Sequence, residues 1–146
     1  MKKQVLLGML TALVLGITVV GCGSKSNDIL DAFDFSTAAP SSSALAAAGY
    51  ITEVDFNLIM NTAGGGYYGW AFDNSGYLIM AWTGRSISDF NNVADVLDVI
   101  FGEIDRDHYD NYYNAFGWGY DLDFTTKNFS MMDYYISAGT MILTFD

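Results

Sequence analysis

Four acidic side chains gather within eight residues of the second half of the chain, and their oxygen atoms are the ligands that calcium favours. They are Glu103, Asp105, Asp107 and Asp110. The spacing departs from a calcium-binding loop, because Tyr109 takes the place of the third ligand and no glycine follows. The segment is therefore predicted to be a solvated run of charges, with a weak calcium site as the alternative and no other cofactor expected.

A catalytic centre would have few residues to draw on, because the chain has one histidine, His108, and one cysteine, Cys22. A Ser-His-Asp triad would have to use His108, yet the sequence has no G-x-S-x-G elbow to present a serine. Two of the 17 Asp and Glu side chains could pair for glycoside hydrolysis, but no cleft signature points to such a pair. The chain is predicted not to be an enzyme. The alternative is a small hydrolase that uses carboxylates near residues 103–110.

The most distinctive feature is a cluster of aromatic residues around and after the acidic segment: Tyr109, Tyr112, Tyr113, Phe116, Trp118 and Tyr120. Tyrosine and tryptophan combine a flat apolar face with a polar tip, so they suit stacking on ligands and at protein interfaces. We expect Phe116 and Tyr120 to lie in the core. Three rings should be partly exposed: Tyr112, Tyr113 and Trp118. Together with Tyr109, these three are the predicted binding residues.

The chain begins with a segment that is typical of an export signal. Lys2 and Lys3 give it a basic start, and residues 5–20 follow as 16 uncharged, mostly apolar positions. A helix needs about 20 such residues to cross a bilayer, so this run is short for a membrane span. Residues 1–21 are therefore predicted to be a signal peptide.

The signal ends in Val19-Val20-Gly21-Cys22, which resembles the lipobox of bacterial lipoproteins. The resemblance covers the first 23 residues and implies cleavage before Cys22, with a diacylglyceryl thioether on its sulfur and a fatty acid such as palmitate on its amino group. Two or more acyl chains hold a protein firmly on a membrane. The resemblance thus implies a lipid-anchored protein of the cell envelope. Gly23, rather than Asp, follows the cysteine, which is similar to lipoproteins sent to the outer membrane in cells with two membranes.

Removal of residues 1–21 leaves a strongly acidic chain. All 17 Asp and Glu remain against four Lys and Arg, which gives a formal charge of −13. Such a polyanion is repelled by nucleic acids and by anionic lipid headgroups, so nucleic-acid binding is excluded. The partners left open are a protein, a neutral glycan and cations.

A polar, low-complexity segment over residues 22–49 is predicted to tether the lipidated cysteine to a single domain over residues 50–146. Within the tether, Ser41 to Ala48 suit a short helix that Gly49 closes. A few apolar residues could dock on the domain as a short element: Ile29, Leu30, Phe33 and Phe35.

Alternation of apolar and polar residues predicts half-buried strands on both sides of one helix. The predicted strands are 51–60, 68–72, 77–82, 120–124, 129–137 and 140–146. The helix is predicted over residues 88–104, with Ser88 or Asp89 as its N-cap and Val99 as the one apolar residue on the polar side. Its apolar face is formed by Phe90, Val93, Ala94, Leu97, Ile100, Phe101 and Ile104.

These elements predict an α+β fold in which one amphipathic helix joins two antiparallel three-stranded meanders, as a curved sheet or a partly open barrel. A single helix cannot cover both faces of a wide sheet, so the outer face should be covered by the tether region or by a partner. Few Lys and Pro residues lie along the strands to block their edges, which leaves self-assembly through strand edges as an alternative. The sequence thus favours a membrane-tethered, non-enzymatic envelope lipoprotein that acts as a binding or assembly module through its aromatic surface.

Overall fold

A computed structural model describes residues 30–119 and 129–145 of the chain. In chain order its elements are η1 (Leu30–Ala32), α3 (Ser42–Ala47), α4 (Glu53–Ala63), β1 (Tyr67–Phe72), β2 (Leu78–Trp82), α5 (Ile87–Phe101), β3 (Tyr109–Asp110), β4 (Ala115–Gly119), β5 (Met131–Tyr135) and β6 (Thr140–Phe145). The predicted α+β class is confirmed.

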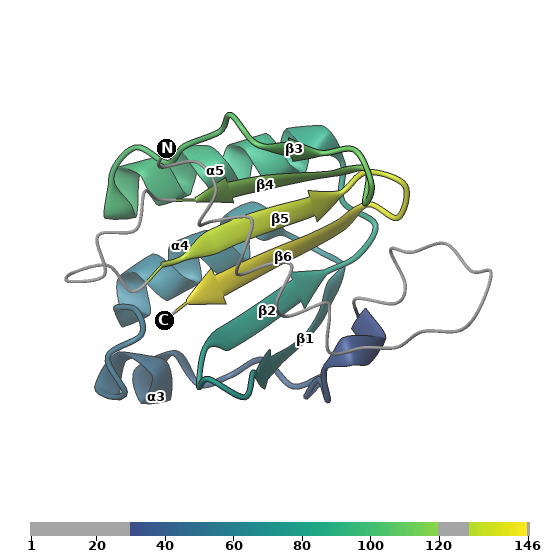
Figure 1. Cartoon of the computed structure of the whole chain (residues 1–146). Helices are drawn as coiled ribbons and strands as arrows, with labels where there is room; N and C mark the ends of the chain where they lie inside the picture. The colour runs from purple at the N-terminus through teal and green to yellow at the C-terminus, as the bar shows by residue number, and fades with distance from the viewer. Residues whose placement is uncertain (1–29, 120–128, 146) are drawn as a thin grey trace.

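The strands form one open antiparallel sheet of six strands in the order β1-β2-β6-β5-β4-β3 (Figure 1). The last strand, β6, lies in the middle of the sheet and pairs with β2 along its length, from Leu78 opposite Phe145 to Trp82 opposite Met141. On its other side β6 pairs with β5. The C-terminal strand therefore joins the two halves of the sheet.

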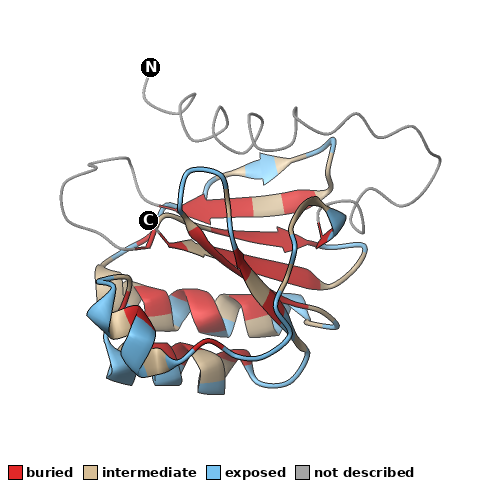
Figure 2. Ribbon diagram, turned by 90° about the horizontal axis from the view of Figure 1, so that it is seen from below, coloured by how far each residue is buried: buried red, intermediate tan, exposed pale blue. Residues whose placement is uncertain are grey.

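Helices α4 and α5 pack side by side against one face of this sheet, and their buried sides face the strands (Figures 1 and 2). The core between the two layers is formed by alternate residues of the strands and by the inner sides of the helices. The helices contribute Phe56, Ile59, Ala63, Phe90, Val93, Ala94 and Leu97. This layer is called the helix side of the sheet below.

The helix predicted over residues 88–104 is confirmed as α5, but it ends at Phe101, so the buried Ile104 lies beyond it. The predicted N-caps, Ser88 and Asp89, are wrong, because the helix begins at Ile87. Ser86 is the N-cap: its Oγ accepts the Asp89 N–H at 3.2 Å, while Asp89 Oδ2 accepts the Ser86 N–H at 2.8 Å. This reciprocal pair is a capping box, which satisfies two backbone donors that a helix start would leave open. Val99 is 82% exposed, as its position on the polar side predicts.

The strand predicted over residues 51–60 is wrong, because this segment forms helix α4. The alternation places Val54 and Leu58 inward, yet both are exposed, whereas Phe56 and Ile59 are buried at helical spacing. Thr52 caps the helix, since its Oγ1 accepts the Asp55 N–H at 3.2 Å. A threonine followed three residues later by an acid is a helix-start signal, and here it outweighs the alternation.

The predicted order of three strands, one helix and three strands is not the order of the described elements. Helix α4 precedes two strands, and α5 precedes four. The strands expected over 68–72, 77–82, 129–137 and 140–146 are found as β1, β2, β5 and β6. The strand expected over 120–124 lies outside the described residues, while β3 and β4 occupy a segment expected to be irregular.

The other face of the sheet, called the second face below, is partly covered by the segment that precedes the domain. Leu30 is buried on it, and Phe33 and Phe35 pack against the same cluster. Ser36 and Trp70 exchange two backbone hydrogen bonds of 2.8 and 3.0 Å, so this segment also pairs with edge strand β1. The expectation that this region covers the outer face is confirmed for these residues.

The helices of the described residues are short, and none is long and apolar enough to cross a membrane. The first of them, α3, is capped by Ser41, and the chain leaves it through Gly49 at a φ of +84°. The expected short helix in this segment is therefore confirmed.

Replacement of Leu97 by alanine tests the packing of α5. Leu97 is fully buried between the helix and the sheet, so Leu97→Ala should lower the free energy of unfolding by about 2–5 kcal/mol. Val99→Ala, on the exposed side of the same helix, should change it by less than about 0.5 kcal/mol. Denaturant titration of both variants measures the difference, and equal losses would show that the inner face of α5 is wrongly assigned.

Candidate functional site

The β3–β4 hairpin presents most of the aromatic residues that the sequence singles out. Tyr109 pairs with Phe116 and Asp110 with Ala115 across its two strands. Its turn is held by the Asp110 carboxylate, whose Oδ1 accepts the N–H groups of Tyr112 at 2.7 Å and Tyr113 at 3.0 Å. This side chain replaces a backbone acceptor in a tight turn, as aspartate often does. The tip of the hairpin is therefore a fixed structure.

Two tyrosines on the hairpin are open to solvent. Tyr112, at the tip, is 67% exposed, and Tyr109 is 39% exposed. The Tyr109 hydroxyl donates to Asn114 Oδ1 at 2.5 Å, and its ring lies 5.2 Å from that of Phe116. Tyr113 meets Tyr112 edge to face at 4.8 Å and packs partly on the second face. The structure thus brings three of the four predicted binding residues together.

The fourth, Trp118, is not partly exposed as expected. It is 7% exposed and lies on the helix side, where its ring centroid is 4.5 Å from that of Phe90. The Arg106 guanidinium lies over the same ring, 5.3 Å from its centroid. The register of β4 decides this outcome, because Phe116 and Trp118 share the face that meets α5. Phe116 is half-buried against the same core, and Tyr120 lies outside the described residues.

The acidic residues before the hairpin do not assemble a metal site in the described structure. Asp105 Oδ1 accepts the Asp107 N–H at 2.9 Å, and Asp110 holds the hairpin turn. Over residues 30–119 and 129–145, no three His, Cys, Asp or Glu side chains come close enough to hold a metal ion together. The four candidate calcium ligands therefore serve the local backbone or face solvent.

Sequence analysis missed Asp133, which is the most unusual charged residue of the described fold. It lies on central strand β5 and is 3% exposed, and its Oδ1 has no hydrogen-bond partner. Burial raises the pKa of its carboxyl from 3.8 to about 7. The sequence does contain a sign of it, because Asp133 is the one acid in the otherwise apolar and aromatic run Met131–Tyr135. This run forms β5, which lies between β6 and β4.

Asp133 faces His108 across a glycine on the second face. Gly117 pairs with Asp133 in the sheet and donates its N–H to the His108 carbonyl at 3.2 Å. A Cβ on Gly117 would lie 3.2 Å from Asp133 Oδ1 and 3.5 Å from His108 Cδ2. His108 Nε2 is also buried without a partner. Two buried polar atoms without a hydrogen-bond partner therefore lie close together over Gly117, where there is no room for a side chain.

Acidic groups surround the buried Tyr135 hydroxyl near this pair. Burial raises the pKa of Tyr135 strongly, and the neighbouring Asp133, Tyr113 and Asp110 raise it further. All four side chains belong to β3, to β5 or to the hairpin turn. The hairpin thus has tyrosines at its tip, and on the second face the half-buried Asp110 and the buried Asp133 of β5 lie near Tyr135.

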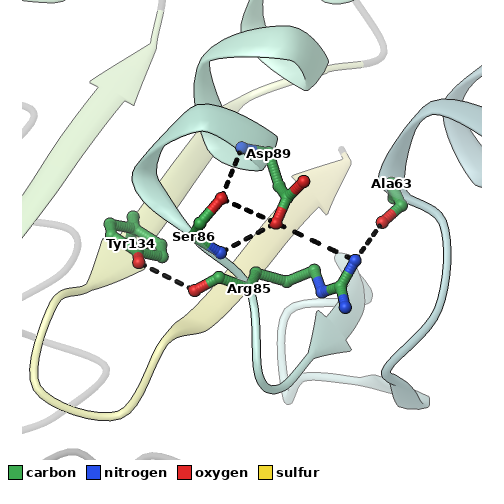
Figure 3. Close-up of polar contacts among 5 residues, drawn as sticks. All are labelled: Ala63, Arg85, Ser86, Asp89 and Tyr134. Atoms are coloured by element: carbon green, nitrogen blue, oxygen red, sulfur yellow. Dashed lines mark hydrogen bonds and ion pairs between the residues drawn. The ribbon is translucent and has the colours of Figure 1, made fainter.

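Both arginines of the described residues bind groups of the helices on the helix side of the sheet. The Arg85 guanidinium donates to the Ala63 carbonyl at 3.1 Å and lies 3.9 Å from the Asp89 carboxylate (Figure 3). Arg106 pairs with Asp95 at 2.9 Å and also with Asp98. Neither supplies a counter-ion to Asp133.

Comparison with protein-family models, with curated proteins and with solved structures finds no match to this chain.

The pKa of Asp133 predicts how stability depends on pH. A carboxyl with a pKa near 7 when folded and 3.8 when unfolded binds its proton more tightly in the folded state. This contribution is complete below pH 3.8 and is lost as the pH rises through about 7. The parent should therefore lose stability relative to Asp133→Asn as the pH rises. Between pH 4 and pH 8, the difference in the free energy of unfolding between the two proteins should change by about 4 kcal/mol in favour of Asp133→Asn.

Urea titrations of both proteins at several pH values measure this difference. Asp34→Asn, which changes an exposed carboxylate, serves as the control and should show no such gain. A stability difference between Asp133→Asn and the parent that does not vary with pH would contradict a carboxyl buried in its acid form.

Proposed function

We propose that the chain is the precursor of a lipid-anchored, non-enzymatic protein of the bacterial cell envelope. Its mature domain binds a protein partner or a neutral glycan through the aromatic hairpin. The observation that carries the proposal is Tyr112, which stands 67% exposed on a turn that the Asp110 carboxylate fixes. Tyr109 and Tyr113 extend the surface on either side of it.

A fixed tyrosine is an efficient binding group. It presents a large apolar face and a hydroxyl, and it loses little side-chain entropy when its backbone is already held. The Tyr109 ring is held by Asn114 and Phe116, and the Tyr112 ring by Tyr113. This surface suits stacking on a sugar ring or on a flat protein patch.

The anchor completes the proposal. A lipidated Cys22 would hold the protein on the membrane, in the outer membrane where the cell has two, while its acidic surface is repelled by anionic headgroups. The aromatic hairpin would then be directed at envelope components rather than at lipid.

The two alternatives have less support. Self-assembly through strand edges needs a long open edge, whereas β1 pairs with Ser36 and the edge strand β3 spans two residues. A carboxylate hydrolase needs two carboxyl groups open to substrate, and the most unusual carboxyl, Asp133, is buried.

The anchor is tested by Cys22→Ser, which removes the sulfur that would carry the diacylglyceryl group. The variant should lose fatty-acid labelling in cells, and it should remain uncleaved or leave the membrane fraction. Metabolic labelling with a fatty-acid analogue and fractionation measure both effects. Incorporation of the label into Cys22→Ser at the level of the parent would refute lipidation at this residue.

The hairpin is tested by Tyr112→Ala and Tyr109→Ala. Each should weaken recovery of the partner or glycan from envelope extracts, with a loss of about 1–2 kcal/mol or roughly tenfold in affinity. Their melting temperatures should stay close to that of the parent, because both rings are exposed. Trp118→Ala removes a core ring, so it should melt far lower.

Tyr68→Ala is the matched control, because Tyr68 is an exposed tyrosine of β1, outside the hairpin. It should leave binding unchanged. Equal loss of binding in Tyr68→Ala and Tyr112→Ala would remove the hairpin from the proposal.

A further inference from the structure

We propose that residues 30–38, called the strap below, shorten the membrane tether, so that the domain is held close to the membrane with the second face of its sheet toward the lipid. The inference rests on the lipid anchor proposed at Cys22 and is independent of the tyrosines on the hairpin. It assigns the helix layer, rather than the second face, to the side that envelope partners reach.

The strap is fastened to the sheet at three points. Leu30 is 9% exposed within the apolar cluster of the second face. The Phe35 ring meets that of Tyr68 edge to face at 5.4 Å. At the edge of the sheet, Ser36 and Trp70 of β1 exchange two backbone hydrogen bonds. An apolar side chain, a ring contact and a strand pairing therefore act together along one short segment.

The chain then passes around the edge of β1 to the helix side. The Trp70 indole, which packs on the helix side, donates its Nε1–H to the Ala38 carbonyl at 2.7 Å. Helix α3 follows, and its Leu45 is 5% exposed in the core between the sheet and the helices. The segment from Leu30 to α3 therefore holds the edge of the sheet from both faces.

Strand β1 is shaped to admit the strap. A Cβ at Gly69 would lie 2.7 Å from the Ser36 carbonyl oxygen and 2.9 Å from Phe35 Cβ, which is closer than Cβ atoms approach other groups. A glycine inside a strand often marks a place where another backbone comes close. The pairing register of β1 also shifts here, between Tyr67 and Gly69. Any other residue at position 69 would therefore push the strap away from the strand.

The docked strap leaves little chain between the anchor and the domain. Seven residues, 23–29, separate Cys22 from Leu30. The eight backbone steps from Cys22 to Leu30 span at most about 29 Å when fully extended. If all of residues 22–49 served as the tether, the same geometry would allow about 100 Å. Docking of the strap therefore shortens the reach of the tether roughly threefold.

So short a connection also selects the face of the domain that turns to the membrane. A domain of about 100 residues has a radius of gyration of about 13 Å, so it is more than about 30 Å across. The connection starts at Leu30 on the second face, whereas α4 and α5 cover the opposite face (Figures 1 and 2). With the helix layer against the membrane, Leu30 would lie farther from the lipid than the connection reaches. The second face therefore turns toward the membrane.

The test uses the lipidated protein, extracted from membranes and reconstituted in phosphatidylcholine vesicles. With the Cys22 sulfur acylated, an introduced cysteine is the one free thiol of the chain, and it is labelled with a fluorophore. Asp34→Cys places the label on the exposed part of the strap, and Val99→Cys places it on the exposed side of α5. Lipids that carry a quencher on the headgroup should quench the label at position 34 strongly and the label at position 99 weakly.

Two variants displace the strap in different ways. Gly69→Ala places a methyl group against the Ser36 carbonyl, and Trp70→Phe removes the donor to Ala38 while keeping a ring. Each should reduce the difference in quenching between the two labels and speed hydrogen exchange at the Ser36 amide, with the larger effect in Gly69→Ala. Gly65→Ala is the matched control, because a Cβ there meets nothing within 4 Å, and it should behave as the parent does.

The outcomes separate this inference from the anchor on which it rests. Mass spectrometry that finds no acyl group on Cys22 would refute the anchor, and the inference with it. An acylated protein whose two labels are quenched equally, or whose label at position 99 is quenched more, would overturn the inference alone. Quenching that both variants leave unchanged, although the Ser36 amide exchanges faster in them, would overturn it as well.

Discussion

Arg85 is the residue on which the two-layer arrangement depends. Its guanidinium joins the last turn of α4 to the first turn of α5, while its backbone N–H donates to the Gly139 carbonyl at 2.8 Å and its carbonyl accepts the Tyr134 hydroxyl at 2.8 Å (Figure 3). One residue thus ties both helices to β5 and to the β5–β6 turn. The close approach requires glycine at position 139, where a Cβ would lie 2.6 Å from the Arg85 carbonyl oxygen and φ is +59°.

The same junction explains why the second half of the chain can hold the hairpin in place. The β5–β6 turn is fixed beside α5. From there β6 pairs with β2, and the other edge of β5 pairs with β4. Arg106 then fastens the segment before β3 to α5 through Asp95 and Asp98. The hairpin is therefore held at its base by the sheet and by charge pairs to the helix, although its tip extends into solvent. Rigid support of this kind is what an exposed binding loop needs.

Much of this fold could be predicted from the sequence, and the wrong predictions have physical causes. The period of α5 identifies its inner face, and the need to cover a wide sheet identifies Leu30, Phe33 and Phe35. Residues 53–63 satisfy both a strand and a helix pattern, so only the cap at Thr52 distinguishes them. The positions of Trp118 and Asp133 depend on strand register and on which strands are neighbours, and a single sequence contains neither piece of information.

Alternation along the hairpin strands places two kinds of side chain on opposite faces of the sheet. The side chains of Tyr109, Phe116 and Trp118 point to the helix side, whereas those of His108 and Asp110 point to the second face. The tip tyrosines and Asp110 therefore share one backbone, and the Asp110 carboxylate that faces the second face also fixes the turn that carries Tyr112 and Tyr113.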